Sequence, residues 1–292
     1  MLHSLAVSTI WHVAKIYPPP REMVDSIQSQ IWKFVWSKKP ELVRRETCMS
    51  NYDHGGLRVN HLDIKSEALL IGRIFRFLDV NHEACPWQAL MRYYEARPLV
   101  QTRSEVHWNR RFGPRVIWKD IWKEIAHSMN DPVLRDFDWR TVHRILPVNS
   151  RMHQWNSRLP SRCARCGALE HLLVDCPKIK DMSLFILNLC DRIDPSVIGL
   201  SEKNLFLGCF SQRATKDLLP YIMCVGKFSA WKERVSVQFK KDQKINCATY
   251  FNYVRRRLRM EQCFISVETF MSKWCINNVL ACVRDDNIQV LI

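Results

Sequence analysis

Apolar residues recur along this chain mainly three and four positions apart, which is the spacing of one face of an amphipathic helix. The pattern fills residues 2–16, stops at the three prolines 18–20, and resumes over residues 21–37, because proline lacks the amide that a helix interior needs. A third helix is expected over residues 64–78, beginning near Asp63. Strand-like alternation is rare, so the predicted fold class is mostly α, with segments packed as helical bundles.

The rest of the chain continues the helical pattern in pieces of varied length. Ile117, Ile121 and Ile125 predict a helix that ends before Asn130. Residues 81–135 are otherwise less regular, with tryptophans and tyrosines recurring among arginines. Further helices are expected over residues 136–150, 181–193, 202–210, 215–238 and 246–283.

The stretch CARCGALEHLLVDC carries the clearest candidate chemistry. It places Cys163, Cys166, His171 and Cys176 at the spacing Cys-x2-Cys-x4-His-x4-Cys. Three thiolates and one imidazole complete the closed tetrahedron of a structural Zn²⁺ site and leave no position for a catalytic water. We therefore predict a small Cys₃His zinc knuckle embedded in the helical fold, with zinc coupled to local folding. The alternative is four unconnected residues in a cysteine-rich chain.

The interior of this knuckle has no aromatic side chain that could stack on a base. Its apolar residues are leucines, alanines and a valine, which favours a knuckle that packs against neighbouring helices. Arg162 and Arg165 are candidates for phosphate contacts beside it.

The charge balance favours a polyanionic partner. Lys and Arg number 44 against 29 Asp and Glu, for a net charge of +15, and nucleic acid is the commonest polyanion that such proteins bind. RNA or DNA would be held largely through its phosphates; the alternative is a basic surface without that partner. The candidate basic clusters are Lys33, Lys38, Lys39, Arg44 and Arg45; Arg103, Arg110, Arg111 and Arg115 around Trp108; and Arg255, Arg256, Arg257 and Arg259.

The third of these basic clusters follows Tyr250, Phe251 and Tyr253. Arginines with aromatic neighbours are typical of proteins that hold single-stranded nucleic acid. The alternative is a helix whose arginines face solvent while its aromatic rings pack inward. The tryptophans of the chain are expected to lie in the core more often than to form stacking platforms.

The 12 cysteines are expected to be reduced. No basic segment precedes the apolar residues after Met1, so no signal peptide is expected, and no apolar run reaches the roughly 18 residues that a membrane span needs. The nine cysteines outside the motif are scattered and typical of small core residues. These features predict an intracellular protein, in the nucleus or cytoplasm, without a membrane partner.

Three pairs of blocks resemble one known family. They are IWHVAKIYPPPREMVDSIQSQIWKFVWSKK with DHGGLRVNHLDIKSEALLIGRIFRFL, VHRILPVNSRMHQWN with RCARCGALEHLLVDCP, and YIMCVGKFSAWKER with YFNYVRRRLRMEQ. In this order they are similar to the part of the reverse transcriptase of non-LTR (LINE-type) retrotransposons that follows the polymerase palm. The resemblance covers nearly the whole chain, although the four residues between Cys166 and His171 are fewer than the family usually has.

The resemblance implies four regions: a thumb-like helical region 1–80, a Trp/Arg-rich linker 81–135, a zinc-knuckle region 136–180 and a C-terminal helical region 181–292. It also implies binding to RNA template or target DNA, with no small-molecule substrate. The chain lacks the aromatic-x-Asp-Asp turn that holds two Mg²⁺ ions in a polymerase; the adjacent aspartates Asp285 and Asp286 are expected at a solvated helix end. We therefore expect no enzyme activity from this chain alone. The alternative is a decayed or domesticated remnant that acts as a structural zinc or protein-interaction module.

Overall fold

The computed structural model describes residues 11, 14, 19–37, 39–77, 101–127, 131–158, 168–177, 179–196, 201–208, 218–239, 248–284 and 287–291. The chain divides into two compact units, Met1–Thr102 and Arg103–Ile292. The helix expected over residues 2–16 lies outside the described residues, apart from helical positions Trp11 and Ala14. The second unit contains most of the three regions expected after residue 80.

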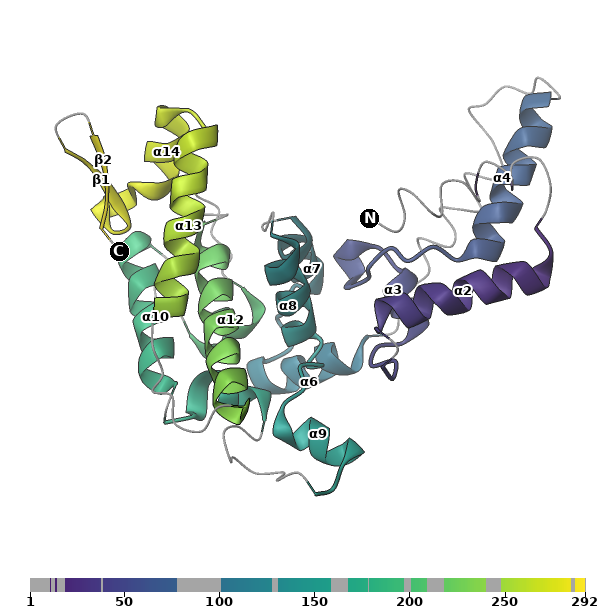
Figure 1. Ribbon diagram of the computed structural model, residues 1–292, viewed down its shortest axis with the longest axis horizontal. Coiled ribbons are helices and arrows are strands. Elements are labelled where there is room, and N and C mark those ends of the chain that lie inside the picture. Colours follow the sequence, from purple (N-terminus) through teal and green to yellow (C-terminus); the bar gives the residue numbers. More distant parts are fainter. Residues whose placement is uncertain are drawn as a thin grey trace. The chain divides into compact units, whose positions relative to one another are not determined.

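The prediction of a mostly helical protein is confirmed (Figure 1). The first unit contains α2 (Arg21–Val35), α3 (Arg45–Met49), the 3-10 turn η1 (Tyr52–His54) and α4 (Leu62–Phe77). The second unit contains α6 (Arg103–Phe112), α7 (Trp118–His127), α8 (Pro132–Val142), α9 (Asn149–Trp155), the π-helical turn η3 (His171–Asp175), α10 (Lys180–Ile193), α11 (Glu202–Leu207), α12 (Leu218–Phe239), α13 (Ala248–Phe264), α14 (Val267–Trp274), the 3-10 turn η4 (Ile276–Asn278), β1 (Ala281–Arg284) and β2 (Asn287–Val290).

In the first unit, α2 packs against α4, as their matching apolar stripes predict. Ile31 and Trp32 of α2 are buried, and the backbone N–H of Leu62 at the start of α4 donates to Oε1 of Gln28 at 3.0 Å. The chain between α3 and α4 turns at Gly56, where a Cβ atom would lie 1.9 Å from the carbonyl oxygen of Ser50. Only glycine therefore permits this close approach of two backbone segments.

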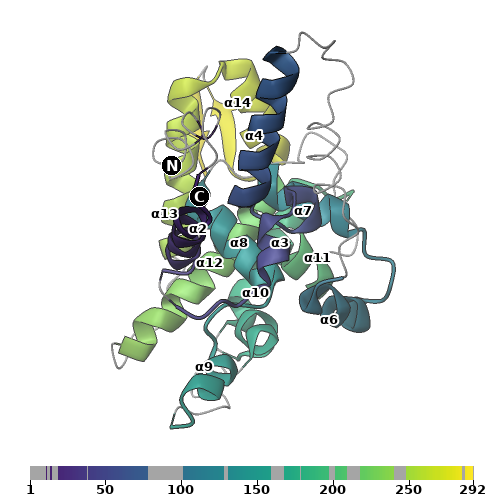
Figure 2. The same cartoon turned by 90° about the vertical axis from the view of Figure 1, so that its right-hand side faces the viewer.

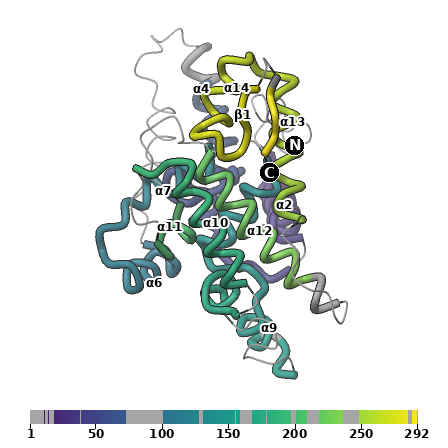
Figure 3. The backbone as a smooth tube through the Cα atoms, turned by 90° about the vertical axis from the view of Figure 1, so that its left-hand side faces the viewer, coloured from purple at the N-terminus to yellow at the C-terminus, as the bar shows by residue number. Residues whose placement is uncertain are grey.

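The centre of the second unit is α12, which packs against α10, α13 and α8 (Figures 1 and 3). Its buried residues are apolar over most of the first four turns, so almost every side of this part of the helix is covered. At Gly226 a Cβ atom would lie 2.2 Å from Cδ1 of the buried Ile186 on α10. The spacing of α10 and α12 thus depends on the missing side chain.

Two buried polar pairs connect α12 to the elements on its α8 side. The Lys227 ammonium forms an ion pair with the carboxylate of Asp138 on α8, and these side chains are 2% and 10% exposed. The Arg234 guanidinium donates to Oδ1 of Asn149 at the start of α9, at 2.7 Å. Because a buried charge without a partner is costly, these contacts fix which faces of α8 and α12 meet.

Four tryptophans of the second unit lie in its core, as expected: Trp108, Trp122, Trp139 and Trp274. Trp108 and Trp122 are buried, and their indole N–H groups donate at 2.8 Å to the carbonyl of Val142 and to Glu105. Trp108 also packs on Phe206, with ring centroids 4.9 Å apart. These rings are covered and are not available as stacking platforms for bases.

Two predicted helix boundaries are wrong. The helix expected over residues 136–150 begins at Pro132, because the Asp131 side chain caps the amide of Val133 at 2.8 Å and proline suits a first turn. It ends at Val142, before Arg144, whose φ of 56° is left-handed. The separate helix α9 then follows Pro147.

The helix expected over residues 246–283 is also interrupted. It ends at Phe264, and α14 begins after Ser266, whose hydroxyl accepts from the amide of Thr269 at 3.2 Å. Beyond η4 the chain forms an antiparallel pair of β1 and β2, with Cys282 opposite Gln289. Asp285 and Asp286, which were expected at a solvated helix end, lie outside the described residues.

No helix in the described ranges combines the length and the apolar character that crossing a membrane requires. Figure 2 gives a second view of the elements, with α9 and α6 at one end of the second unit.

Candidate zinc site and nucleic-acid interface

The second half of the predicted knuckle is one wide turn. Residues His171–Asp175 form the π-helical turn η3, closed by the Cys176 N–H, which donates to the carbonyl of His171 at 2.7 Å. The two candidate ligands in this half therefore stand at the two ends of a single turn. π-helical turns are rare in proteins, and those that occur are often found at functional sites.

Leucine side chains hold this turn on the helical core. Leu169, Leu172 and Leu173 are buried, and η3 packs against α10 and α12. The Ser183 hydroxyl on α10 donates to the carbonyl of Leu173 at 2.5 Å. The expectation that the knuckle packs its leucines on neighbouring helices therefore agrees with the described half of the motif.

The side chains at the ends of this turn fit a metal ligand pair. Nε2 of His171 is buried and has no hydrogen-bond partner in the described structure, and Cys176 is 2% exposed. A buried polar atom without a partner is rare unless an ion or water completes it. Imidazole nitrogen and cysteine sulfur are the donor atoms that Zn²⁺ prefers.

Cys163, Cys166, Arg162 and Arg165 lie outside the described residues. Within the ranges that the structure does describe, no group of three or more metal-ligating side chains gathers at one point. The four-ligand set therefore remains a prediction, of which the described structure places two members.

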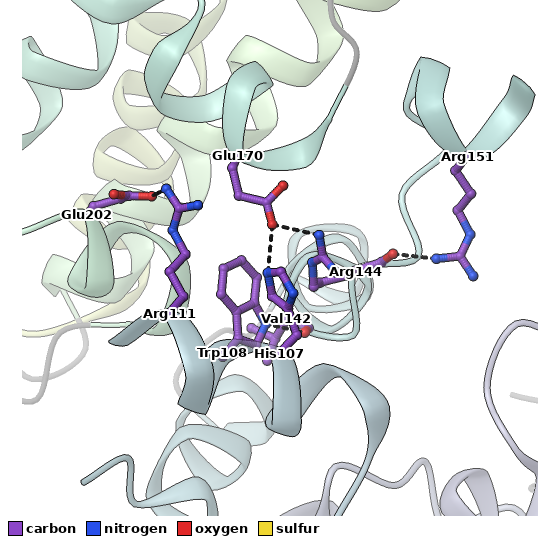
Figure 4. Close-up of polar contacts among 8 residues, drawn as sticks. All are labelled: His107, Trp108, Arg111, Val142, Arg144, Arg151, Glu170 and Glu202. Carbon is purple, nitrogen blue, oxygen red and sulfur yellow. Dashed lines mark hydrogen bonds and ion pairs between the residues drawn. The ribbon is translucent and has the colours of Figure 1, made fainter. Parts of the chain in front are cut away.

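Glu170, the residue before His171, is anchored to two other parts of the unit (Figure 4). Its Oε1 accepts from Nη2 of Arg144 at 2.7 Å and lies 3.0 Å from Nε2 of His107 on α6. Burial raises the pKa of this carboxyl, but the hydrogen bonds and the Arg144 charge outweigh burial and hold the pKa below its usual value. The carboxylate is therefore ionised at neutral pH and ties the turn to α6 and to the α8–α9 connection.

The α8–α9 connection is itself fixed. The carbonyl of Arg144 accepts from Nη1 of Arg151 at 2.5 Å, and the Arg144 guanidinium lies 5.6 Å from the centre of the Trp108 ring. The same Trp108 donates to Val142, as Figure 4 shows. Burial and the neighbouring Arg144 lower the pKa of Arg151.

The densest basic cluster lies on α13, and its four arginines have different surroundings. Arg255, Arg256 and Arg259 are exposed. Arg257 is partly buried; its Nε donates to Glu261 at 2.5 Å, and its guanidinium lies 5.5 Å from the centre of the Tyr221 ring. Three of the four predicted arginines therefore face solvent, and the fourth belongs to an internal ion pair.

Glu261 gathers three donors between α13 and α14. Besides Arg257, Lys273 donates at 2.9 Å and the Trp274 indole at 2.7 Å. Burial raises the pKa of Glu261, but these hydrogen bonds outweigh it and keep the pKa below its usual value. Lys273 and Trp274 thus hold α14 on α13, while Arg257 pairs with Glu261 within α13.

The aromatic residues before this cluster pack against other rings. Tyr250 is buried; Phe251 and Tyr253 are partly exposed and meet Phe185 at 5.8 Å and Phe228 at 5.5 Å, both edge-to-face. These contacts favour the interpretation of a helix with arginines on one face and rings packed on neighbouring helices. Contacts to phosphate are therefore better supported at α13 than stacking on bases.

The other basic clusters are also mostly exposed. Lys33, Lys39 and Arg44 face solvent, Lys38 lies outside the described residues, and Arg45 pairs with Glu41 at 2.6 Å. Around Trp108, Arg103, Arg110 and Arg115 are exposed, while Arg111 forms an ion pair with Glu202.

Two residues of structural importance were not predicted from the sequence. Lys227 is the single charge within the apolar run YIMCVGKFSAW, and such a charge indicates a buried ion pair. Glu170 stands next to a candidate ligand among buried leucines, which is the same kind of signal. Their partners, Asp138 and Arg144, could not be inferred, because each contact joins distant parts of the sequence.

Comparison with protein-family models gives one match. Residues 102–182 match the family described as zinc-binding in reverse transcriptase. This range runs from the start of α6 into α10 and includes all four predicted ligands and the Glu170 anchor. Comparisons with curated proteins and with solved structures found no match to the chain. The match supports a reverse-transcriptase-associated region with zinc as its metal.

Proposed function

We propose that this chain is a non-catalytic, zinc- and nucleic-acid-binding part of a non-LTR retrotransposon reverse transcriptase, C-terminal to the polymerase domain. The observation that carries the proposal is the η3 turn, with a buried thiol at one end and, at the other, a buried imidazole nitrogen that has no hydrogen-bond partner among the described residues. It lies within the region that matches the reverse transcriptase zinc-binding family. The proposed location is intracellular, in the nucleus or cytoplasm.

In this proposal Cys163, Cys166, His171 and Cys176 hold one Zn²⁺. The ion supplies a structural cross-link between the two halves of the knuckle, and it stabilises the loop between them. The chain's own contribution is to seat the second half on α10 and α12 through buried leucines. The rest of the second unit contributes exposed arginines that can neutralise phosphates.

We further propose that RNA or DNA contacts the α13 face formed by Arg255, Arg256 and Arg259. Arginine binds phosphate oxygens with two parallel N–H groups, and this contact does not depend on sequence. Because the neighbouring rings Phe251 and Tyr253 already pack edge-to-face on Phe185 and Phe228, base stacking contributes little here. Binding should therefore depend strongly on salt and weakly on sequence.

Replacing Arg255, Arg256 and Arg259 together by glutamine is expected to flatten the salt dependence of binding. Each lost phosphate contact removes roughly 0.7 unit from the slope of log K against log salt for a single strand, so up to about 2 units are expected for the triple variant. The measurement is fluorescence anisotropy with a labelled single-stranded oligonucleotide at several salt concentrations.

Arg257→Gln is the matched control, since it lies on the same helix but pairs with Glu261. It should lower stability and leave the slope unchanged. A triple variant with the slope of the wild-type protein would place the contact surface elsewhere, for example at Lys39 and Arg44. No binding of the wild-type protein at low salt would contradict the nucleic-acid part of the proposal.

The chain alone is expected to show no polymerase activity. Two-metal nucleotidyl transfer in this class of polymerase uses an aromatic-x-Asp-Asp turn, and the sequence contains no such turn. Incubation with primed RNA template, deoxynucleotides and Mg²⁺ should give no primer extension above a heat-inactivated sample. Extension that depends on the intact chain would overturn this prediction.

One observation favours the alternative of a protein-interaction module. Met260, Phe264, Val267 and Met271 are exposed apolar residues on either side of the corner between α13 and α14, and Phe264 is 84% exposed. Exposed apolar side chains near one another are typical of interaction surfaces. The salt titration separates the two functions, because an interaction module without nucleic-acid binding gives no salt-dependent signal.

A further inference from the structure

The contacts of Glu170 suggest a role that ligand spacing alone does not reveal. We propose that Glu170 is a positioning residue for the zinc site, which holds the His171–Cys176 turn in its metal-binding conformation before any metal is bound. This inference rests on the proposed zinc-binding function. It deepens that proposal by naming what fixes half of the site.

The attachment of Glu170 is strong and shared between two elements. One carboxylate oxygen is reached by the Arg144 guanidinium at 2.7 Å and by the His107 imidazole at 3.0 Å. The Glu170 side chain is only 9% exposed, so water competes little for these bonds. A charge-assisted hydrogen bond in such surroundings is stronger than a neutral one at the surface.

The partners of Glu170 are held in place and cannot simply follow the turn. Arg144 has a left-handed backbone, its carbonyl is bound by Arg151, and its guanidinium lies over the buried Trp108. Trp108 in turn donates to the carbonyl of Val142. The anchor point for Glu170 is therefore itself held by contacts with Arg151 and Trp108 (Figure 4).

The other side of the turn is also fixed. Leu172 and Leu173 are buried, and Ser183 on α10 donates to the carbonyl of Leu173. His171 thus lies between two fixed attachments, Glu170 on one side and Leu172 on the other. Because a preorganised ligand loses less freedom on binding, zinc affinity should depend on Glu170 although Glu170 is not a ligand.

The direct test is Glu170→Gln, which keeps the shape of the side chain and removes its charge. Zinc affinity, measured by competition with a chelator on the full chain, is expected to fall on the order of tenfold. In Co²⁺-substituted protein the visible absorption bands are expected to shift, because the position of His171 relative to the metal changes. A role in stability alone would not move these bands.

Glu202→Gln is the matched control. It removes the other carboxylate that pairs with α6, at Arg111, and it does not touch the turn. This variant should keep the wild-type zinc affinity and cobalt spectrum. If Glu170→Gln fails to fold, His107→Gln replaces it in both measurements. This variant removes only one of the two contacts of Glu170, so a smaller loss of zinc affinity and a smaller shift of the cobalt bands are expected.

A metal-free measurement separates this inference from the zinc-binding proposal. In chelator-treated wild-type protein, the amides of residues 169–176 are expected to exchange slowly, and Glu170→Gln should accelerate their exchange. Equal exchange in the two proteins, or equal zinc affinity and cobalt spectra, would overturn the positioning role. A wild-type protein that binds no zinc but keeps slow exchange would contradict the proposed function and leave the anchor supported.

Discussion

Replacing Cys176 by serine is expected to abolish stoichiometric zinc binding. Serine lacks the thiolate that the ion prefers, and Cys176 closes the π turn whose other end is His171. With only three ligands left, the loop between Cys163 and Cys176 loses its cross-link and should become accessible to protease. Elemental analysis of the purified full chain, together with limited proteolysis, measures both effects.

Cys263→Ser is the control for this experiment, because Cys263 is exposed on α13 and is outside the motif. It should keep one zinc per chain. The α2–α4 packing of the first unit should survive in the Cys176→Ser variant, since its apolar contacts do not involve the motif. Equal zinc content in Cys176→Ser and wild-type protein would show that the motif spacing is coincidental.

The second large effect is expected at the buried ion pair of α8 and α12. Asp138→Ala leaves the Lys227 ammonium, which is 2% exposed, without its partner, and the expected loss in the free energy of opening is about 3–5 kcal/mol. Native-state hydrogen exchange of α12 amides in the full chain reports this loss for the second unit. The loss arises because the Lys227 ammonium would be left buried without a partner, which costs more free energy than the ion pair itself contributes.

Two further variants test that reason. Asp136→Ala on the same helix breaks the exposed pair with Arg140 at 2.9 Å, and it should cost less than about 1 kcal/mol. The double replacement Asp138→Leu with Lys227→Met should recover most of the lost protection, because no charge is left buried. An Asp138→Ala protein as stable as the wild type would show that Lys227 reaches water in solution.

The predicted helix boundaries agree best with the structure where a helix has one apolar stripe that packs on a single neighbouring helix, as α2 and α4 do on each other. The helix expected over residues 21–37 is present as α2, and the one expected over residues 64–78 is present as α4. In both cases the stripe alone determines the helix, and the preceding prolines or Asp63 mark its start. The boundaries agree to within two residues, which is the usual uncertainty of helix ends.

The errors occur where local signals compete with the stripe. Ser266 caps a new helix inside an apolar pattern that continues across it, so residues 246–283 read as one segment. Asn277 and Asn278 adopt left-handed backbone angles and direct the chain into the β1–β2 pair, an effect that periodicity does not register. The apolar spacing that predicts a helix end before Asn130 does not show that the Asp131 side chain starts the next helix.

For the candidate site, the sequence selects a set of ligands, which stays a prediction, but it does not indicate the contacts that support them. Spacing along the chain selects His171 and Cys176, because ligand geometry is local. The contacts of Glu170 with Arg144 and His107 join residues far apart in sequence, and only the packing of α6 and the α8–α9 connection reveals them. The separate surroundings of Arg257 and its neighbours likewise follow from the position of Glu261 and Tyr221.

The contact of Gly226 with Ile186 has a consequence for how this sequence can change over time. α10 begins directly after the knuckle, and the Lys180 N–H donates to the carbonyl of Cys176 at 2.9 Å. A side chain at position 226 must displace the Ile186 side chain on α10, the helix that follows the predicted ligand Cys176. In related copies that lose this glycine, we expect a smaller residue at position 186 to appear first, so that two distant positions drift together while the ligand spacing is kept.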